Sequence, residues 1–289
     1  MERVDIAILG TGPAGLEAAI TATIRNKKIL LIGSKLLSSK VGKAHAIQNY
    51  LGLPAIAGED LKAAFQAHLD SMGIEITEDK VSAVYSMGDY FSIQAANATY
   101  EATTVILATG VVLGKPYPGE DQFVGRGVSY CATCDAPLYK GKTVAIVGDS
   151  PKEEAEVDFM AEVAGKVYYF PLYQDPVQVS DQVEVIHEIP TEIIGKMKAD
   201  TLKTRDGSYD VDGIFLLRNA VAPDKLVPGL EVDGAHVKVD RTMAGSLPGL
   251  FACGDIVGKP YQYIKAAGEG NVAALSAVDY LAELKRAQA

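Results

Sequence analysis

Residues 4–15 read Val4-Asp5-Ile6-Ala7-Ile8-Leu9-Gly10-Thr11-Gly12-Pro13-Ala14-Gly15, a buried-strand pattern that runs into a glycine-rich turn. The apolar run 4–9 is typical of a strand in a parallel sheet, and a helical pattern follows the last glycine directly. Between a strand and a helix, Gly10 permits the tight turn, Gly12 lets the backbone approach a pyrophosphate, and Gly15 lets the helix pack closely on the strand. The N-terminus of the helix adds N–H groups that bind phosphate. The sequence therefore predicts a dinucleotide-binding α/β domain at this end of the chain.

The strand predicted at residues 29–32 departs from the usual pattern of such domains. It ends in Gly33-Ser34-Lys35, without the Asp or Glu that usually binds the adenosine ribose. We therefore expect Ser34 or Lys35 to make this contact, through ribose or phosphate oxygens.

The surrounding segment is unusual in charge. No acidic residue occurs between Ala18 and Gly58, whereas six basic residues do: Arg25, Lys27, Lys28, Lys35, Lys40 and Lys43. On a chain with a net charge of −10, such a segment is either ordinary solvated surface or a region that steers an acidic partner by long-range attraction.

Length and composition limit the class of protein. A chain of 289 residues is long enough for two domains, and its net charge of −10 argues against nonspecific binding of nucleic acid. No apolar run reaches the roughly 18–20 residues that span a bilayer, so no membrane association is expected. The N-terminus lacks the basic-then-apolar order of a secretory signal, and three cysteines do not make a disulfide framework. We expect a cytoplasmic enzyme.

Two of the three cysteines stand together in Cys131-Ala132-Thr133-Cys134-Asp135. Thiols at this spacing close a small, easily reduced disulfide. No second C-x-x-C and no His pair stands at ligand spacing, so no metal site is expected. The Pro- and Gly-rich segment 114–120 precedes the pair and is a candidate interdomain hinge.

Gly125-Arg126-Gly127-Val128-Ser129 followed by this cysteine motif resembles the redox centre of the low-molecular-weight thioredoxin reductases, two-domain flavoproteins of the disulfide oxidoreductase superfamily. The resemblance covers nearly the whole chain, and it implies FAD as cofactor, thioredoxin as protein substrate and a homodimer. Cys134 matches the thiol nearest the flavin, and Cys131 matches the interchange thiol that attacks the protein disulfide. Asp135 matches the acid that protonates the leaving thiolate.

The resemblance also implies a set of FAD contacts along the chain. They are Gly10, Gly12, Pro13, Ala14, Gly15, Ser34, Lys35, Asn49, Val81, Thr109, Gly110, Gly254, Asp255, Gln262, Tyr263 and Ile264. Where the family has Arg-Gln-Ala, this chain has Tyr261-Gln262-Tyr263, whose rings would stack over the isoalloxazine or fill space left by an absent nicotinamide. Cys253, alone in an apolar strand, is expected to be a packed core thiol.

A second dinucleotide fold is predicted after the strand at 143–147, but it has lost its binding features. The middle and last glycines of the motif have no counterpart after Gly148, and Asp149, Glu153 and Glu154 would repel phosphate. The family carries a His-Arg-Arg cluster that clamps the 2′-phosphate of NADPH, whereas no arginine occurs here between Arg126 and Arg205.

We therefore predict an α/β protein of two Rossmann-like, three-layer ββα domains. A discontinuous FAD domain, residues 1–113 and 244–289, would surround an inserted disulfide-bearing domain at 114–243. The loss of both nucleotide determinants makes the chain similar to the ferredoxin-dependent flavin thioredoxin reductases of anaerobic bacteria. Reduced ferredoxin is then the expected electron donor, and the basic residues between Arg25 and Lys43 are its candidate docking stretch.

Two alternatives are compatible with the sequence. One is an NADPH-dependent thioredoxin reductase with an atypical nucleotide loop. The other is a flavin-binding redox sensor, or a diflavin protein, without turnover.

Overall fold

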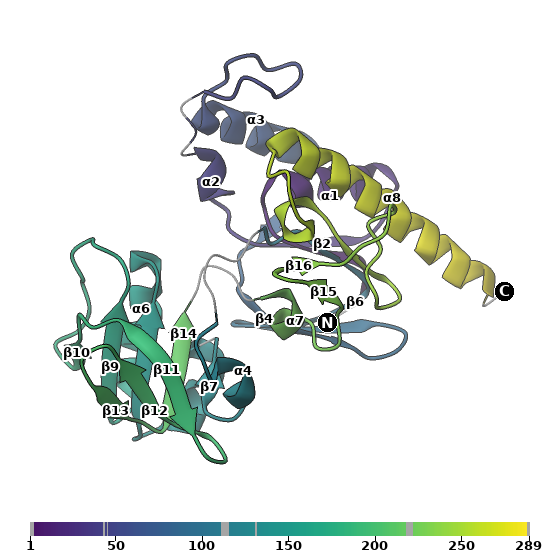
Figure 1. The fold of residues 1–289 in the computed structure, drawn as a ribbon. Coiled ribbons are helices and arrows are strands. Elements are labelled where there is room, and N and C mark those ends of the chain that lie inside the picture. Colours follow the sequence, from purple (N-terminus) through teal and green to yellow (C-terminus); the bar gives the residue numbers. More distant parts are fainter. Residues whose placement is uncertain are drawn as a thin grey trace. The chain divides into compact units, whose positions relative to one another are not determined.

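The computed structural model describes residues 3–42, 44, 46–110, 116–130, 132–217 and 222–287, apart from the side chains of Ser39, Thr133 and Cys134. The chain forms two compact units (Figure 1): residues 1–112 with 222–289, and the inserted residues 113–221. The chain returns to the first unit at Ala222, not at residue 244 where the sequence analysis placed this boundary. The reason is packing, because residues 222–243 form a short helix and a hairpin that contact elements of the first unit.

The first unit is built on a seven-stranded sheet, in which β17 pairs with β6 outside the order β3-β2-β1-β6-β5-β4. The strands are β1 (Val4–Leu9), β2 (Ile29–Ile32), β3 (Ile76–Thr77), β4 (Val81–Ser86), β5 (Phe91–Ala95), β6 (Thr99–Leu107) and β17 (Leu250–Ala252). Strand β6 is long enough to pair antiparallel with β5 at its start and parallel with β17 at its end. Strands β3, β2, β1, β6 and β17 run parallel to one another, so their carboxyl ends share one edge of the sheet.

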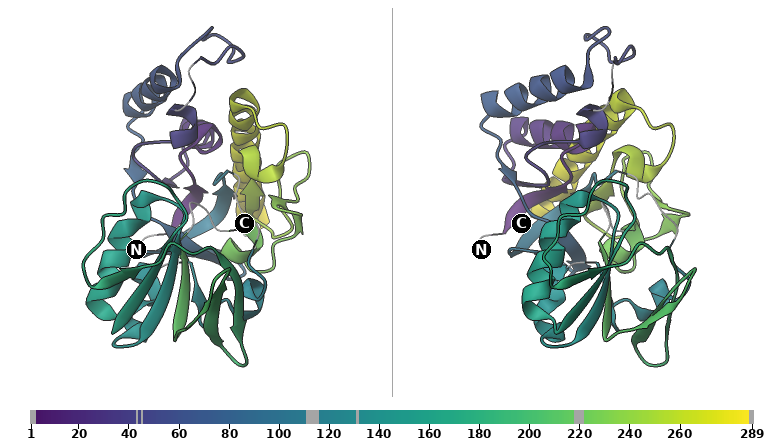
Figure 2. Two further views of the ribbon diagram at one scale, coloured as in Figure 1. Left: turned by 60° about the vertical axis from the view of Figure 1, so that its left-hand side comes forward. Right: turned by 90° about the vertical axis from the view of Figure 1, so that its left-hand side faces the viewer.

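Helices α1 (Pro13–Ile24) and α8 (Tyr263–Ala287) lie side by side on one face of this sheet (Figure 2). The helices of the first unit are α1 (Pro13–Ile24), α2 (Ser39–Gly42), α3 (Gly58–Ser71), α7 (Pro223–Leu226), the 3-10 turn η3 (Gly254–Val257) and α8 (Tyr263–Ala287), and its hairpin is β15 (Val232–Asp233) with β16 (His236–Val237). Apolar side chains of β1, β6, α1 and α8 form one core, among them Ile6, Ile8 and Leu16. Among the described residues, no helix has both the length and the apolar character that crossing a membrane requires.

The second unit has a five-stranded parallel sheet in the order β10-β9-β8-β14-β7 and a three-stranded antiparallel sheet in the order β11-β12-β13. The strands are β7 (Val128–Ser129), β8 (Thr143–Gly148), β9 (Lys166–Pro171), β10 (Val183–Val185), β11 (Pro190–Gly195), β12 (Ala199–Thr204), β13 (Ser208–Asp210) and β14 (Gly213–Leu217). The helical segments are α4 (Glu120–Phe123), α5 (Ala132–Asp135), η1 (Ala136–Tyr139), η2 (Pro151–Glu153) and α6 (Glu154–Val163).

Successive side chains of β8 point to opposite faces of the sheet, and this explains the three layers of the unit. Val144 and Ile146 pack with Met160 of α6, whereas Ala145 and Val147 pack with the apolar side chains of the antiparallel sheet, such as Leu202. The parallel sheet is therefore buried between a helix and a second sheet. The predicted α/β class with two Rossmann-like domains is confirmed.

The contact between α1 and α8 yields a prediction. A methyl group at Gly270 of α8 would lie 2.1 Å from the carbonyl oxygen of Ala14, whereas one at Gly268 meets no atom within 4 Å. Gly270→Ala should lower the free energy of unfolding by about 1–3 kcal/mol, because α8 must move off α1. Gly268→Ala should be neutral or stabilise by about 0.5–1 kcal/mol. Urea unfolding of both variants checks this, and equal effects would contradict the close packing.

Candidate functional site

Four segments that the sequence predicts to bind FAD lie at the carboxyl edge of the first unit's sheet. Residues 10–15 follow β1, residues 33–35 follow β2, Thr109-Gly110 come just after β6, and Gly254-Asp255 come just after β17. Carboxyl ends of parallel strands meet at one edge, where α/β proteins bind their ligands. The structure therefore brings these predicted residues together.

The glycine turn after β1 has the geometry that its sequence predicts. Gly10 has a φ of +120°, and a methyl group there would lie 2.3 Å from the carbonyl oxygen of Ala108. A methyl group at Gly15 would lie 1.9 Å from the carbonyl oxygen of Gly10, so helix and strand meet backbone to backbone. Gly12, by contrast, is the N-cap of α1 and faces open space.

The first turn of α1 is suited to bind an anion. It has no side-chain cap and no acidic residue, and Pro13 occupies the position whose N–H no helix bond needs. The N–H groups of this turn and the positive end of the helix dipole thus face the open space beside Gly12.

The turn after β17 packs directly on the start of α1. Gly254 has a φ of +84°, and a methyl group there would lie 2.8 Å from the Cβ of Ala14. Asp255 follows and is half-buried. Burial raises the pKa of the Asp255 carboxyl, while the nearby ammonium groups of Lys40 and Lys265 act in the opposite direction.

Glu78 is a candidate residue that the sequence analysis missed. The backbone N–H of Lys35 donates to Glu78 Oε1 at 3.4 Å, and the Thr11 hydroxyl donates to the carbonyl oxygen of Ser34 at 3.0 Å. The residue after β3, the next parallel strand, therefore places a carboxylate beside the end of β2, where the sequence has none. The signal was an acidic residue directly after a strand of only two residues, too short to recognise from periodicity.

The segment before α8 is tied to two distant loops of the same unit. Asn49 Nδ2 donates to Gln262 Oε1 at 2.6 Å, and the Tyr263 hydroxyl donates to the carbonyl oxygen of Lys40 at 3.1 Å. The Tyr261 hydroxyl lies 2.7 Å from His236 Nε2, on the hairpin that the sequence analysis assigned to the other domain. Of the remaining predicted contacts, Val81 begins β4 and Ile264 lies in the first turn of α8.

The residues at this edge fit FAD. Thr109 Oγ1 is buried and has no hydrogen-bond partner within the described residues, so it offers a polar group to a ligand. The open space at Gly12, the uncapped first turn of α1 and the turn at Gly254 are suited to a pyrophosphate and its ribityl chain.

The cysteine motif follows β7 at the carboxyl edge of the second unit's sheet. Cys131 and the side chain of Cys134 lie outside the described residues. The N–H of Ala132 donates to Glu156 Oε2 of α6 at 3.2 Å, which ties α5 to α6. Asp135 is half-buried, and its charge adds to the effect of burial in raising the pKa of the Tyr139 hydroxyl.

Cys253 is a different kind of thiol. It is fully buried among the apolar residues of the first unit, and burial raises its pKa far above the usual range. A thiol that stays protonated is a poor nucleophile, so Cys253 is a core residue, as expected.

The nucleotide turn of the second unit is filled by the chain's own side chains. Counted from Gly148, the positions of the second and third glycines hold Ser150 and Glu153. Glu154 Oε1 accepts hydrogen bonds from the Tyr173 hydroxyl at 2.6 Å and from the N–H of Gln178 at 3.1 Å.

Tyr169 completes this network beneath the turn. Its hydroxyl lies 3.0 Å from that of Tyr173, and a methyl group at Gly148 would lie 2.6 Å from it. Burial, together with the charges of Glu154, Glu153 and Asp149, raises the pKa of Tyr169 to about 12. Phenol groups and carboxylates therefore occupy the place where a pyrophosphate would need N–H groups.

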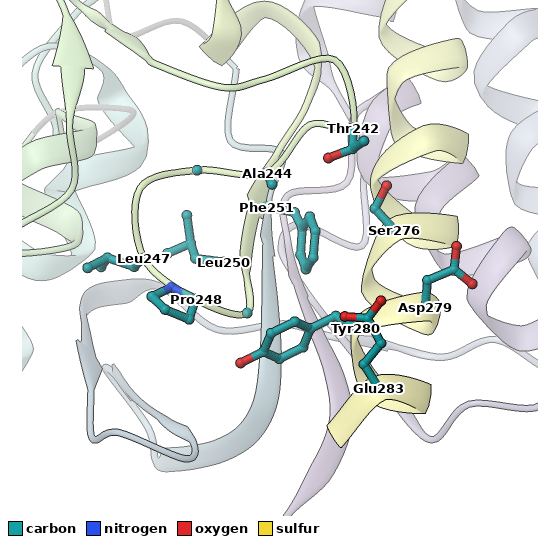
Figure 3. Close-up of a pocket in the computed structure, with 12 residues that line it drawn as sticks. Thr242, Ala244, Leu247, Pro248, Leu250, Phe251, Ser276, Asp279, Tyr280 and Glu283 are labelled. Atoms are coloured by element: carbon teal, nitrogen blue, oxygen red, sulfur yellow. The ribbon is translucent and has the colours of Figure 1, made fainter. Parts of the chain in front are cut away.

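A separate hollow of about 310 Å³ lies beside the start of β17 and the last turns of α8 (Figure 3). Phe251 and Tyr280 meet edge to face at its wall, and Asp279 and Glu283 project from α8 at its rim. It adjoins the amino end of β17, so it is distinct from the edge that carries Gly254 and Asp255.

Comparisons with known proteins agree on one family. The pyridine nucleotide-disulphide oxidoreductase family matches residues 4–151. The thioredoxin reductase of Listeria innocua is 30% identical over 304 residues, which cover 98% of this chain and 95% of the relative. A crystal structure of a ferredoxin-flavin thioredoxin reductase from Clostridium acetobutylicum is 52% identical with a TM-score of 0.93, and the match covers 99% of both chains. A thioredoxin reductase from Gloeobacter violaceus is 26% identical with a TM-score of 0.83, covering 97% of this chain and 95% of that one.

The tyrosine network predicts a dependence of stability on pH. An unfolded tyrosine has a pKa of about 10. Between pH 10 and 12 the unfolded chain therefore loses the Tyr169 proton while the folded chain keeps it, so stability falls as the pH rises. In Tyr169→Phe this contribution is absent, and the loss of stability between pH 9.5 and 11.5 should be smaller than in wild type. Urea unfolding at several pH values measures it, and identical pH slopes in both proteins would refute the assignment.

Proposed function

The chain belongs to the thioredoxin reductases of the pyridine nucleotide-disulphide oxidoreductase family, and we propose that it passes electrons from reduced ferredoxin through FAD and the Cys131–Cys134 pair to the disulfide of a thioredoxin. The family that the sequence suggested is confirmed by these relatives, and with it FAD as the cofactor. When bound, FAD supplies the chemistry that this route needs, because a flavin takes up electrons singly and releases them as a pair.

In this proposal, the first unit of the chain holds the cofactor. The first turn of α1 would bind the pyrophosphate through its N–H groups, and the turn with Asp255 would bind the ribityl chain. The hydroxyl of Thr109, which has no partner in the described part of the chain, would gain one.

In the second unit, the cysteine pair carries the reducing equivalents. Two electrons and two protons convert the Cys131–Cys134 disulfide to two thiols. The Cys131 thiolate then attacks one sulfur of the thioredoxin disulfide, and the other sulfur leaves as a thiolate that Asp135 protonates. Cys134 next attacks Cys131 of the mixed disulfide, which releases reduced thioredoxin and restores the internal disulfide.

The filled nucleotide turn supports ferredoxin over NADPH as the donor. Ser150 and Glu153 replace the glycines that let a backbone approach a pyrophosphate, and the next residue, Glu154, is hydrogen-bonded to the Tyr173 hydroxyl. Asp149 adds to the negative charge at this point, which opposes a polyanion. The 52% identity to a chain described as a ferredoxin-flavin thioredoxin reductase supports the same choice.

An anaerobic reduction experiment tests the donor. Reduced ferredoxin should bleach the visible absorption of bound FAD, and added thioredoxin should then gain thiols in proportion to the electrons supplied. NADPH should leave the absorption unchanged, because its pyrophosphate finds carboxylates where the turn needs N–H groups. Prompt bleaching by NADPH would overturn the proposal in favour of an NADPH-dependent reductase.

The same assay separates an enzyme from a redox sensor. Cys131→Ser should still allow ferredoxin to bleach the flavin but should abolish the transfer to thioredoxin, because the interchange thiol is lost. A wild-type protein that bleaches with ferredoxin yet never reduces thioredoxin would support the sensor instead.

The structure divides the candidate docking stretch between two edges of the sheet. Arg25, Lys27 and Lys28 lie between α1 and the start of β2, whereas Lys35 and Lys40 come after its end. The four residues of β2 span about 13 Å between the two groups. Only the second group shares an edge with the predicted FAD contacts, so Lys35 and Lys40 are the better candidates for docking an acidic donor; Lys43 lies outside the described residues.

Charge reversal tests this division. Lys35→Glu with Lys40→Glu should raise the KM for ferredoxin about tenfold at low ionic strength, and salt should reduce the difference. Arg25→Glu with Lys27→Glu makes the same change in net charge at the other edge and should change the KM by less than about twofold. The KM for ferredoxin of each double variant is measured by following flavin reduction in proteins with equal FAD content. Equal effects of the two pairs would mean that only total charge matters.

A further inference from the structure

We infer that Lys265 and Glu269 of α8 form a positioning pair for FAD. They hold the turn Gly254–Gly258, which carries Asp255, in the conformation that presents it to the cofactor. This inference rests on the proposed FAD site but not on the identity of the electron donor.

The Lys265 ammonium is held by two carbonyl groups of the turn and by the carboxylate of Glu269. Lys265 Nζ donates to the carbonyl oxygens of Gly258 at 2.7 Å and Gly254 at 3.2 Å, and it lies 3.0 Å from Glu269 Oε2. Two of the three ammonium donors are thus given to backbone carbonyls of the turn, and the charge of Lys265 is paired with that of Glu269. The contacts of Lys265 thus favour a role in holding the turn.

Glu269 completes the arrangement from the next turn of the helix. Its Oε2 accepts a hydrogen bond from the N–H of Gly254 at 3.0 Å. Both the N–H and the carbonyl group of Gly254 are thus held by this pair, at a residue whose φ of +84° is in the left-handed region. The pair fixes the backbone at the position where the chain leaves β17 for the predicted FAD contact Asp255.

The placement of Lys265 opposes the local preference of a helix. It is the third residue of α8, where the positive end of the helix dipole disfavours a cation. Its side chain is only 20% exposed, as is that of Glu269. A half-buried lysine at this end of the helix is held there by tertiary contacts, and such conflicts between local and global preference cluster at functional sites.

The turn that the pair holds is also packed against the phosphate-binding helix. A methyl group at Gly254 would collide with the side chain of Ala14 in the first turn of α1, and one at Gly270, the residue after Glu269, would collide with the carbonyl oxygen of Ala14. A shift of the Gly254–Gly258 turn would therefore change both predicted halves of the FAD site.

Titration of the apo-protein with FAD, followed by quenching of flavin fluorescence, tests the inference. Lys265→Met keeps the apolar stem but loses three contacts and leaves Glu269 unpaired, so the Kd for FAD should rise at least about tenfold. Lys265→Arg retains a cation with several donors and should raise it by about threefold or less. Lys285→Met in the last turn of α8 is the matched control and should leave the Kd unchanged.

A double-mutant cycle and hydrogen exchange identify how the pair acts. In Lys265→Met with Glu269→Gln, no unpaired charge remains, so the increase in Kd should be smaller than the product of the two single increases. Hydrogen exchange of residues 253–258 in apo Lys265→Met should be faster, while exchange in β17 should stay as in wild type.

The possible results separate this inference from the proposed function. A Kd of Lys265→Met within twofold of wild type would overturn the positioning role. A raised Kd with unchanged exchange at residues 253–258 would also overturn it, because Lys265 would then bind FAD directly. A wild-type protein that binds no FAD would instead refute the proposed function.

Discussion

Backbone contact around Ala14 sets the geometry of the first unit. Gly254 and Gly270, from the turn after β17 and from α8, both approach Ala14 so closely that a methyl group would collide with it. Gly15 meets the carbonyl of Gly10 in the same way. Segments that are more than 200 residues apart in the sequence therefore meet at the first turn of α1, where the uncapped N–H groups face open space. The close packing around Ala14 thus brings sequence motifs from both ends of the chain to one place.

The second unit has the same strand–turn–helix arrangement as the first, but the side chains at its turn do not suit a phosphate. Its parallel sheet is buried between α6 and an antiparallel sheet, as in a nucleotide-binding domain, so the apolar pattern of its strands has kept the fold. Its turn holds carboxylates and a tyrosine network in place of glycines and N–H groups. Fold and ligand binding depend on different residues, and a chain can therefore keep one without the other.

Charge is arranged differently in the two units. In the first, Lys40 and Lys265 surround Asp255, and the lysine–glutamate pair of α8 holds the backbone beside it. In the second, Glu154 and Glu156 point from α6 toward the 173–178 loop and the cysteine motif, respectively. Carboxylates in the second unit thus serve internal contacts at the place where a nucleotide-binding domain keeps its phosphate site.

Local pattern determined much of this protein. The run 4–15 and the apolar strand at 143–147 were sufficient to predict two Rossmann-like domains, because a strand, its turn and the following helix are set by neighbours in sequence. FAD followed from the family resemblance, and the redox disulfide of Cys131 and Cys134 stays a prediction. Tertiary structure alone decided the return of the chain at Ala222, the carboxylate of Glu78 beside Lys35, and the pair that holds Gly254. Each of these depends on which strand ends and helix faces pack together, and that packing leaves no periodic signal in the sequence around the residues concerned.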